Sequence, residues 1–251
     1  MVALTVAVVL QVQAQDTRND LAPTGKLRVG AYPGSPLSMV RDQKTGETHG
    51  LSVDLGKVLA QRLGVPFELV SYQRIADVLD AMKAGALDFT VSNATPARAQ
   101  DVAFSPTLLS LELGYLVPIA SSITAADDVD RPGVRIGVPQ GSTSERALPK
   151  LLANATVVPA TNLKVAMEML ARHELDVFAT NKAILYEMSD QLGGARILDG
   201  RWGVEHVAIA IPKGNERALG YVSRFVEEAR ASGLVMHAAE DAGLRGAVSP
   251  E

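Results

Sequence analysis

Two stretches of sixteen residues, "VLDAMKAGALDFTVSN" at residues 78–93 and "AMEMLARHELDVFATN" at residues 166–181, decide the fold of this chain. In both, apolar residues at helical spacing lead to the pair Leu-Asp, and a short apolar run then ends at an asparagine five positions after the aspartate. A helix followed by a strand, written twice in the same form, predicts two similar α/β lobes.

A second repeated pair lies upstream of these two stretches. The segment "GKLRVGAYPGS" at residues 25–35 resembles "PGVRIGVPQGS" at residues 132–142, and each predicts a strand followed by a turn. Within the first unit, a helical pattern at residues 53–64 and a strand pattern at residues 67–71 follow in turn. Strands that alternate with helices predict a parallel sheet covered by helices in each lobe.

Two long apolar segments, at residues 111–120 and 204–211, flank the second repeated unit. Their placement predicts that they cross between the lobes. We therefore expect lobe 1 to comprise residues 24–111 and 207–251, and lobe 2 to comprise residues 112–206.

Composition excludes several classes of function. The net charge of -4 lacks the basic footprint of a nucleic-acid-binding protein. The chain has no cysteine, which rules out disulfides and thiolate metal sites, and none of its four histidines has H-x-x-x-H spacing. We expect neither a metal nor another cofactor.

The N-terminus reads as a targeting segment. Residues 2–10, "VALTVAVVL", are apolar except for Thr5, and Val12 and Ala14 fit the small-residue rule for cleavage after Ala14. The run is shorter than the about 20 residues that span a bilayer. We predict a signal peptide at residues 1–14, with a true start upstream because the basic n-region is missing, and a mature protein exported to the periplasm. The alternative is a buried N-terminal strand.

Polar groups gather where predicted strands end, which is where open parallel sheets bind ligands. In "SNATPAR", residues 92–98, Thr95 is a good N-cap, Pro96 suits the first helical position and Arg98 the third. A cation in a first helical turn opposes the helix dipole, so Arg98 indicates an anionic partner. That partner is either a ligand carboxylate or an internal acid such as Asp101.

The second unit repeats this logic in "GSTSE", residues 141–145. Ser142 and Glu145 match a capping box, and the N–H groups of Ser142 and Thr143 are placed to hold an anion. The alternative is a helix cap with no further role. Asn181 ends the last strand of this unit, and the repeat makes Asn93 its counterpart.

In combination, these residues resemble a known family, the type II periplasmic solute-binding proteins of the polar amino acid group (solute-binding family 3) of ABC transporters. The matching pieces run in family order from about residue 25 to about residue 215, and they are "GKLRVGAY", "GLSVDLGKVLAQRLGV", "VLDAMKAGALDFTVSNATPARAQDVAFSP", "GVRIGVPQGSTSE", "LDVFATN" and "VAIAIPKGN".

The resemblance implies two lobes that are joined by a two-strand hinge and close on one small ligand. It places Arg98 on the ligand's carboxylate, with Thr143 supporting it, and it places Asn181 where the family usually has an aspartate for the α-amino group. Tyr32 lies near the usual position of one aromatic residue, and Arg74 near that of a second. The implied function is capture of a solute in the periplasm, as a monomer, and delivery to a membrane-embedded ABC permease.

The asparagine at position 181 affects the expected ligand. An amide does not neutralise an ammonium, and a buried unpaired charge is very costly. An Asn93–Asn181 pair suits a neutral group, and Arg74 adds a second cationic contact, so we expect a small carboxylate that need not be an α-amino acid. The alternative is that Glu205 or Asp54 supplies the missing charge.

Two other functions stand beside solute transport. Some relatives of this fold resemble cyclohexadienyl dehydratases, whose chemistry needs a general acid or base in the cleft. Asn181 at the central carboxyl position argues against that reading, and the chain has no G-x-S-x-G motif or P-loop, so we expect no enzyme and no catalytic residue. The third reading is a sensory module that reports its ligand to a membrane receptor.

Overall fold

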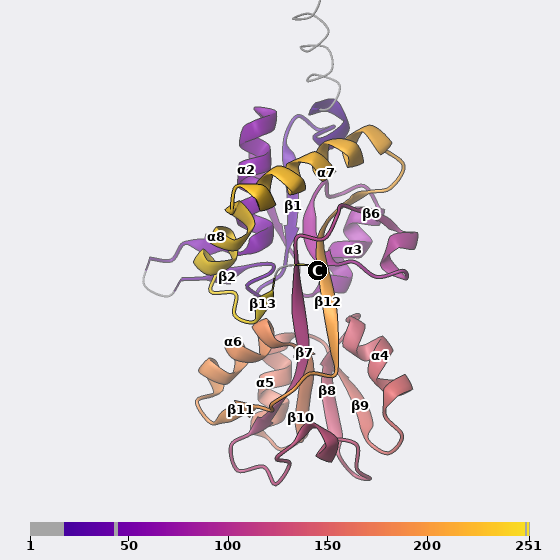
Figure 1. The fold of residues 1–251 in the computed structure, drawn as a ribbon, viewed down its shortest axis with the longest axis vertical. Coiled ribbons are helices and arrows are strands. Elements are labelled where there is room, and N and C mark those ends of the chain that lie inside the picture. The colour runs from indigo at the N-terminus through magenta and orange to yellow at the C-terminus, as the bar shows by residue number, and fades with distance from the viewer. Residues whose placement is uncertain (1–17, 43–44, 249, 251) are drawn as a thin grey trace, which may run out of the picture.

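The computed structural model describes residues 18–42, 45–248 and 250, and it shows two α/β lobes joined by two long strands (Figure 1). The predicted signal peptide lies outside the described residues. The joining strands are β7 (Leu109–Pro118) and β12 (Gly203–Pro212), and they pair antiparallel from Gly203 opposite Leu113 to Val207 opposite Leu109. We call this pair the hinge.

Lobe 1 surrounds one end of the hinge. Strands β1 and β4 pair in parallel, and a bridge from Val29 to Phe89 connects β1 to the residue just before β5. Strand β5 in turn pairs antiparallel with β12. Its strands are β1 (Leu27–Ala31), β2 (Val40–Arg41), β3 (Thr48–His49), β4 (Phe67–Ser71), β5 (Thr90–Asn93), β6 (Val102–Phe104) and β13 (Ala247–Val248). Its helices are α2 (Leu51–Leu63), α3 (Ile75–Lys83), α7 (Glu216–Ala231) and α8 (Leu234–Asp241).

Lobe 2 repeats the arrangement at the other end of the hinge. The strand order is β9, β8, β10 and β7, with β8 parallel to both of its neighbours and β10 antiparallel to β7. Its strands are β8 (Arg135–Pro139), β9 (Thr156–Ala160), β10 (Val177–Asn181) and β11 (Ala195–Ile197). Its helices are α4 (Thr143–Leu151), α5 (Leu163–Ala171) and α6 (Lys182–Leu192).

Helices cover both faces of each sheet, which explains why the strand sequences are almost continuously apolar. In lobe 1, α2, α7 and α8 pack on one face and α3 on the other. In lobe 2, α4 packs on one face and α5 with α6 on the other. This architecture confirms the predicted fold class of two parallel-sheet lobes on a two-strand hinge.

The internal repeat has a shared polar anchor. Asp88 accepts hydrogen bonds from the backbone N, Nε and Nη2 of Arg28 at 2.9, 2.9 and 2.6 Å. Asp176 accepts the same three bonds from Arg135 at 2.8, 2.9 and 2.9 Å. The bonds tie the aspartate before β5 to the beginning of β1 in lobe 1, and the aspartate before β10 to the beginning of β8 in lobe 2. The Leu-Asp pair in the repeated sequence therefore has a structural role.

Several details differ from the sequence-based expectations, among them helix α6, for which no prediction was made. The segment after Thr95 forms a 3-10 helix of only three residues, Arg98–Gln100, because no amphipathic pattern follows it. The predictions also omit strand β9, whose sequence "TVVPA" contains a proline at a sheet edge. The predicted lobe boundaries fall inside β7 and β12, and we retain them as a proposal. No helix in the described part of the chain is long and apolar enough to cross a membrane.

The two anchors differ in burial, which makes them a matched pair for a stability test. The Asp88 side chain is 3% exposed, whereas that of Asp176 is 35% exposed. Breaking a buried, hydrogen-bonded charge pair costs about 3–5 kcal/mol, and exposure to water reduces that cost. We expect Asp88→Asn to lower the free energy of unfolding by about 3 kcal/mol and Asp176→Asn by clearly less, as measured by urea denaturation. Equal losses of unfolding free energy in the two variants would contradict the larger stabilising role given to the buried Asp88.

Candidate ligand-binding site

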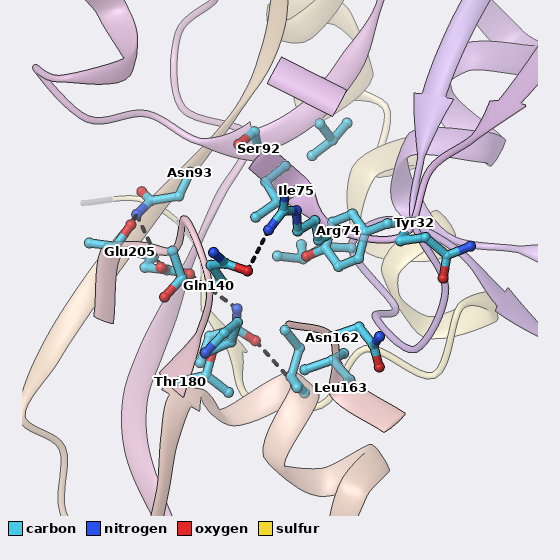
Figure 2. Close-up of a pocket in the computed structure, with 18 of the residues that line it drawn as sticks. Tyr32, Arg74, Ile75, Ser92, Asn93, Gln140, Asn162, Leu163, Thr180 and Glu205 are labelled. Carbon is cyan, nitrogen blue, oxygen red and sulfur yellow. Dashed lines mark hydrogen bonds between the residues drawn. The ribbon is translucent and has the colours of Figure 1, made fainter. Parts of the chain in front are cut away.

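A pocket lies between the lobes at the carboxyl ends of their parallel strands (Figure 2). Each parallel strand contributes lining residues from its carboxyl end or from the segment directly after it, as expected for this class of sheet. The lining residues from lobe 1 and the hinge are Tyr32, Leu37, Gln73, Arg74, Ile75, Val91, Ser92, Asn93, Arg98 and Glu205. Those from lobe 2 are Pro139, Gln140, Ser142, Thr143, Thr161, Asn162, Leu163, Thr180, Asn181 and Ile184.

Arg98 is a buried cation in this pocket, with only 7% of the residue exposed. Its Nη1 donates to Ser92 Oγ at 2.9 Å and to the carbonyl oxygen of Asn93 at 3.2 Å. Its Nη2 reaches the carbonyl oxygen of Gly141 only at 3.5 Å, and its buried Nε has no partner among the described residues. Burial lowers the pKa of the Arg98 guanidinium, and the nearby Glu205 carboxylate opposes that effect.

The internal acid that was considered as a partner for Arg98 lies elsewhere. Asp101 pairs with Lys83, with 2.6 Å between Oδ1 and Nζ. Thr95 does not line the pocket, and its Oγ1 accepts a hydrogen bond from the Arg98 backbone N at 3.2 Å. Thr95 therefore shapes the turn that delivers Arg98, and the short 3-10 helix has no extended dipole that would add to the site.

Glu205 is the acid of the pocket. It lies on hinge strand β12, and the alternation of that strand turns Val204 and His206 toward solvent while Glu205 faces inward with 7% exposure. Its Oε1 accepts from Asn93 Nδ2 and its Oε2 accepts from Asn181 Nδ2, both at 3.1 Å. The two asparagines of the repeat therefore converge on one carboxylate, which Figure 2 shows beside Asn93.

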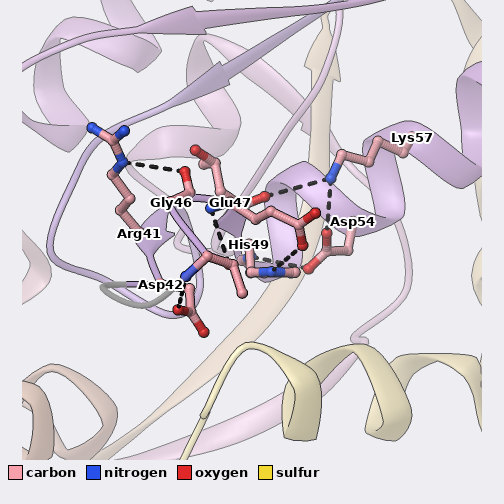
Figure 3. A network of polar contacts seen from close by, with 10 residues as sticks. Arg41, Asp42, Gly46, Glu47, His49, Asp54 and Lys57 are labelled. Carbon is pink, nitrogen blue, oxygen red and sulfur yellow. Dashed lines mark hydrogen bonds and ion pairs between the residues drawn. The ribbon is translucent and has the colours of Figure 1, made fainter.

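Burial raises the pKa of the Glu205 carboxyl above its usual value, and Arg98 with the surrounding hydrogen bonds only partly offsets this effect. The other acid that was considered, Asp54, does not line the pocket. It accepts a hydrogen bond from Gly50 N at 3.0 Å and pairs with Lys57 at 3.5 Å, in the polar network between α2 and the β2–β3 hairpin (Figure 3). Of the two acids considered as the source of the missing charge, Glu205 lies beside Asn181 and Asp54 does not, so the absence of an aspartate at position 181 does not by itself favour a neutral ligand group.

Side chains from the two lobes contact one another across the pocket. Asn93 Nδ2 donates to Thr143 Oγ1 at 2.7 Å, and Arg74 Nη1 donates to Gln140 Oε1 (Figure 2). Gly141 approaches lobe 1 so closely that a Cβ atom there would lie 2.6 Å from the Cβ of Ala76. The lobes therefore stand in a closed arrangement.

The remaining predicted residues occupy supporting positions. Ser142 caps α4 by accepting from Glu145 N at 3.2 Å, while Glu145 accepts from Gly141 N rather than from Ser142 N as a standard capping box would. Tyr32 lines the pocket, and burial raises its pKa. The second cationic contact expected from Arg74 is largely neutralised, because its Nε bonds Asp77 Oδ1 at 2.8 Å.

Several lining residues were not selected from the sequence. Thr161 and Asn162 follow β9, so recognising "TVVPA" as a strand would have placed them at a strand end. Gln140 lies in a predicted strand-end stretch, in which only Ser142 and Thr143 were predicted to hold an anion. Within the residues that the structure covers, no group of three or more histidine, aspartate or glutamate side chains is placed to hold a metal ion.

Comparisons with known proteins agree with the two-lobe fold. The sequence profile of the bacterial extracellular solute-binding proteins, family 3, matches residues 27–241. A glutamine-binding protein of Geobacillus stearothermophilus is 24% identical over 202 residues, which cover 79% of this chain and 77% of the relative. An ABC transporter glutamine-binding protein of Bacillus subtilis is 21% identical over 223 residues, which cover 87% of this chain and 81% of the relative.

A solved structure of an ancestral amino acid-binding protein, described as a precursor of cyclohexadienyl dehydratase, superposes with a TM-score of 0.77 at 26% identity. The match covers 90% of this chain and 98% of that protein. The chain is thus similar to amino acid-binding proteins over nearly its whole described length.

The raised pKa of Glu205 predicts a stability cost for the empty pocket. An acid whose pKa is higher in the folded than in the unfolded state destabilises the fold when it is ionised, from its usual value near 4.5 upward. We expect Glu205→Gln to raise the melting temperature of the ligand-free protein at pH 7. A gain of about 1 kcal/mol corresponds to about 2–4 °C at this chain length.

The pH dependence checks the sign of this effect. The advantage of Glu205→Gln should shrink as the pH is lowered toward 4.5, where Glu205 is protonated in the wild-type fold. Differential scanning calorimetry across this pH range measures the difference. A variant that is less stable than wild type at neutral pH would show that the ionised carboxylate supports the fold.

Proposed function

The chain belongs to the bacterial extracellular solute-binding proteins of family 3, and on that premise we propose that it captures a small carboxylate-bearing solute, an amino acid or a close analogue. We place this activity in the periplasm, with delivery to the membrane permease of an ABC transporter. The observation that carries the proposal is the unsatisfied edge of the buried Arg98 guanidinium.

Arg98 is arranged to receive a carboxylate with two parallel bonds. Nη1 is occupied by Ser92 and Asn93, which fixes the plane of the guanidinium. The Nε–H and one N–H of Nη2 lie on the same edge, and this edge is left without a good acceptor. Two parallel N–H groups match the geometry of a carboxylate, and a charged hydrogen-bonded pair of this kind is short and strong.

The contacts between the lobes support binding that is coupled to closure. Thr143 and Gln140 from lobe 2 reach Asn93 and Arg74 from lobe 1 across the pocket. A ligand that touches both lobes stabilises this closed arrangement relative to an open one, and the permease can then distinguish the loaded from the empty protein. Capture of a ligand is equally the first step of sensing, and we favour transport because a similar protein is named as part of an ABC transporter.

One observation bears on the enzymatic alternative. Glu205 is a buried carboxyl with a raised pKa inside a carboxylate pocket, which is a property of general acids. However, both of its oxygens accept amide N–H bonds, and such bonds favour the ionised acceptor over a proton donor. We therefore propose a binding protein rather than an enzyme. Incubation with prephenate and arogenate tests this choice, since dehydration of either compound would establish the enzyme.

A conservative replacement tests the role of Arg98. Arg98→Lys keeps the positive charge but loses the paired donors, so affinity for carboxylates should fall by about 10- to 100-fold, the equivalent of about 1.5–3 kcal/mol. The measurement is isothermal titration calorimetry with the twenty standard L-amino acids and their deaminated analogues. Arg146→Lys is the control, because Arg146 is exposed on α4 and outside the pocket. Unchanged affinity in folded Arg98→Lys would overturn the assignment.

A further inference from the structure

The Glu205 carboxylate lies at a buried position of the hinge where a charged group lowers the stability of the strand pairing. Its cross-strand neighbour on β7 is the fully buried Leu111, where an apolar side chain would strengthen the pairing. Replacing buried charges by apolar groups is often neutral or stabilising, so the fold has no evident need of this acid. Among the described residues, no lysine or arginine forms an ion pair with it, although Arg98 attracts it through space. The pocket therefore contains a negative charge that is not neutralised by direct contact.

Two amides and the Thr143 hydroxyl orient the Glu205 carboxylate, and because all three are neutral they leave its negative charge unneutralised. Asn93 and Asn181 each donate one N–H to one oxygen of the carboxylate. The Thr143 hydroxyl also hydrogen-bonds to Glu205. An ionised carboxylate has about four acceptor positions, so with three of them used it retains capacity for a further donor from the pocket. An ammonium group carries three hydrogen-bond donors and no acceptor. Its positive charge neutralises the carboxylate, which the neutral amides do not do. The arrangement has the chemistry of a receptor for a primary ammonium.

We infer that Glu205 receives the ammonium group of the solute, so that the ligand is a zwitterion with its carboxylate on Arg98 and its ammonium on the hinge. This inference rests on the proposed function and adds the second charge of the ligand. Asn93 links the two contacts, because its carbonyl oxygen accepts from Arg98 while its side chain donates to Glu205. Charges held on either side of one residue suit a ligand whose two charged groups are adjacent, as in an α-amino acid.

Asn181 is then a positioning residue. Its Oδ1 accepts from Ile184 N at 3.1 Å and caps α6, and its Nδ2 holds Glu205. Both functional groups of the amide are thereby committed to the protein. The negative charge lies on Glu205 of hinge strand β12, and Asn181 at the end of β10 orients that carboxylate.

The test compares amino acids with partners that lack only the α-amino group. The probes are L-alanine, L-glutamine, L-phenylalanine and L-lysine against propionate, glutaramate, 3-phenylpropionate and 6-aminohexanoate, titrated by calorimetry at pH 7. We expect wild type to bind at least one amino acid about 30-fold or more tightly than its deaminated partner, because truncating one member of a buried charge pair has an effect of that size. In Glu205→Gln this preference should disappear.

Relocating the carboxylate distinguishes charge recognition from a structural role. In Glu205→Gln with Asn181→Asp, an acid returns to the pocket from the end of β10, and the preference for the amino acid should be at least partly restored. Glu112→Gln is the matched control, because Glu112 lies on the partner hinge strand, pairs with Lys182 and Arg201, and does not line the pocket. It should keep the wild-type preference.

The outcomes separate this inference from the function on which it rests. If carboxylates bind in an Arg98-dependent manner but wild type does not prefer the amino acids, or Glu205→Gln keeps the preference, the inference is wrong and the proposed function stands. If neither series of probes binds, both are overturned. Loss of preference in Glu205→Gln, with recovery in the double variant, supports the hinge as the ammonium site.

Discussion

The pairing of β7 with β12 is the constraint on which the rest of the structure depends. Lobe 1 extends from β12 through β5 and β6, and lobe 2 extends from β7 through β10 and β11. This order brings the ends of β5 and β10, which are far apart in the chain, to either side of the hinge. The side chains of Asn93 and Asn181 can therefore meet at Glu205, and the pocket forms where both lobes and the hinge contribute.

The charged groups that equip the pocket to bind a ligand lower the stability of the empty protein. Arg98 and Glu205 both lose hydration through burial, and neither is fully compensated by the hydrogen bonds that its neighbours supply. Groups of this kind raise the free energy of the empty site, and a ligand of complementary charge relieves that cost. The supporting side chains, Ser92 on Arg98 and the two asparagines on Glu205, limit the freedom of the charged groups in advance of binding.

Much of the site was visible in the sequence because helix–strand units follow local rules. Arg98 at a predicted helix start indicated an anionic partner, which stays a prediction, and the structure shows only a three-residue 3-10 turn there while burying Arg98 in the pocket. The repeat identified Asn93 and Asn181 as counterparts, and the structure brings them to one carboxylate. Thr95 illustrates the limit of such reasoning. Its capping hydrogen bond is present, but the direction of the turn, which no local pattern encodes, keeps it out of the pocket.

The sequence by itself determined the architecture, since period, capping residues and repeat spacing are properties of short segments. It identified the residues at the ends of β1, β5, β8 and β10, and with them the edge of each sheet where the pocket lies, but it missed the end of β9. Only the tertiary structure decided which acid lines the pocket. Glu205 lies 112 positions from Asn93 and 24 from Asn181, and within its own strand it looks like any polar residue in an alternating pattern. The strand order of the hinge brings the three together, and strand order is set by packing between distant segments.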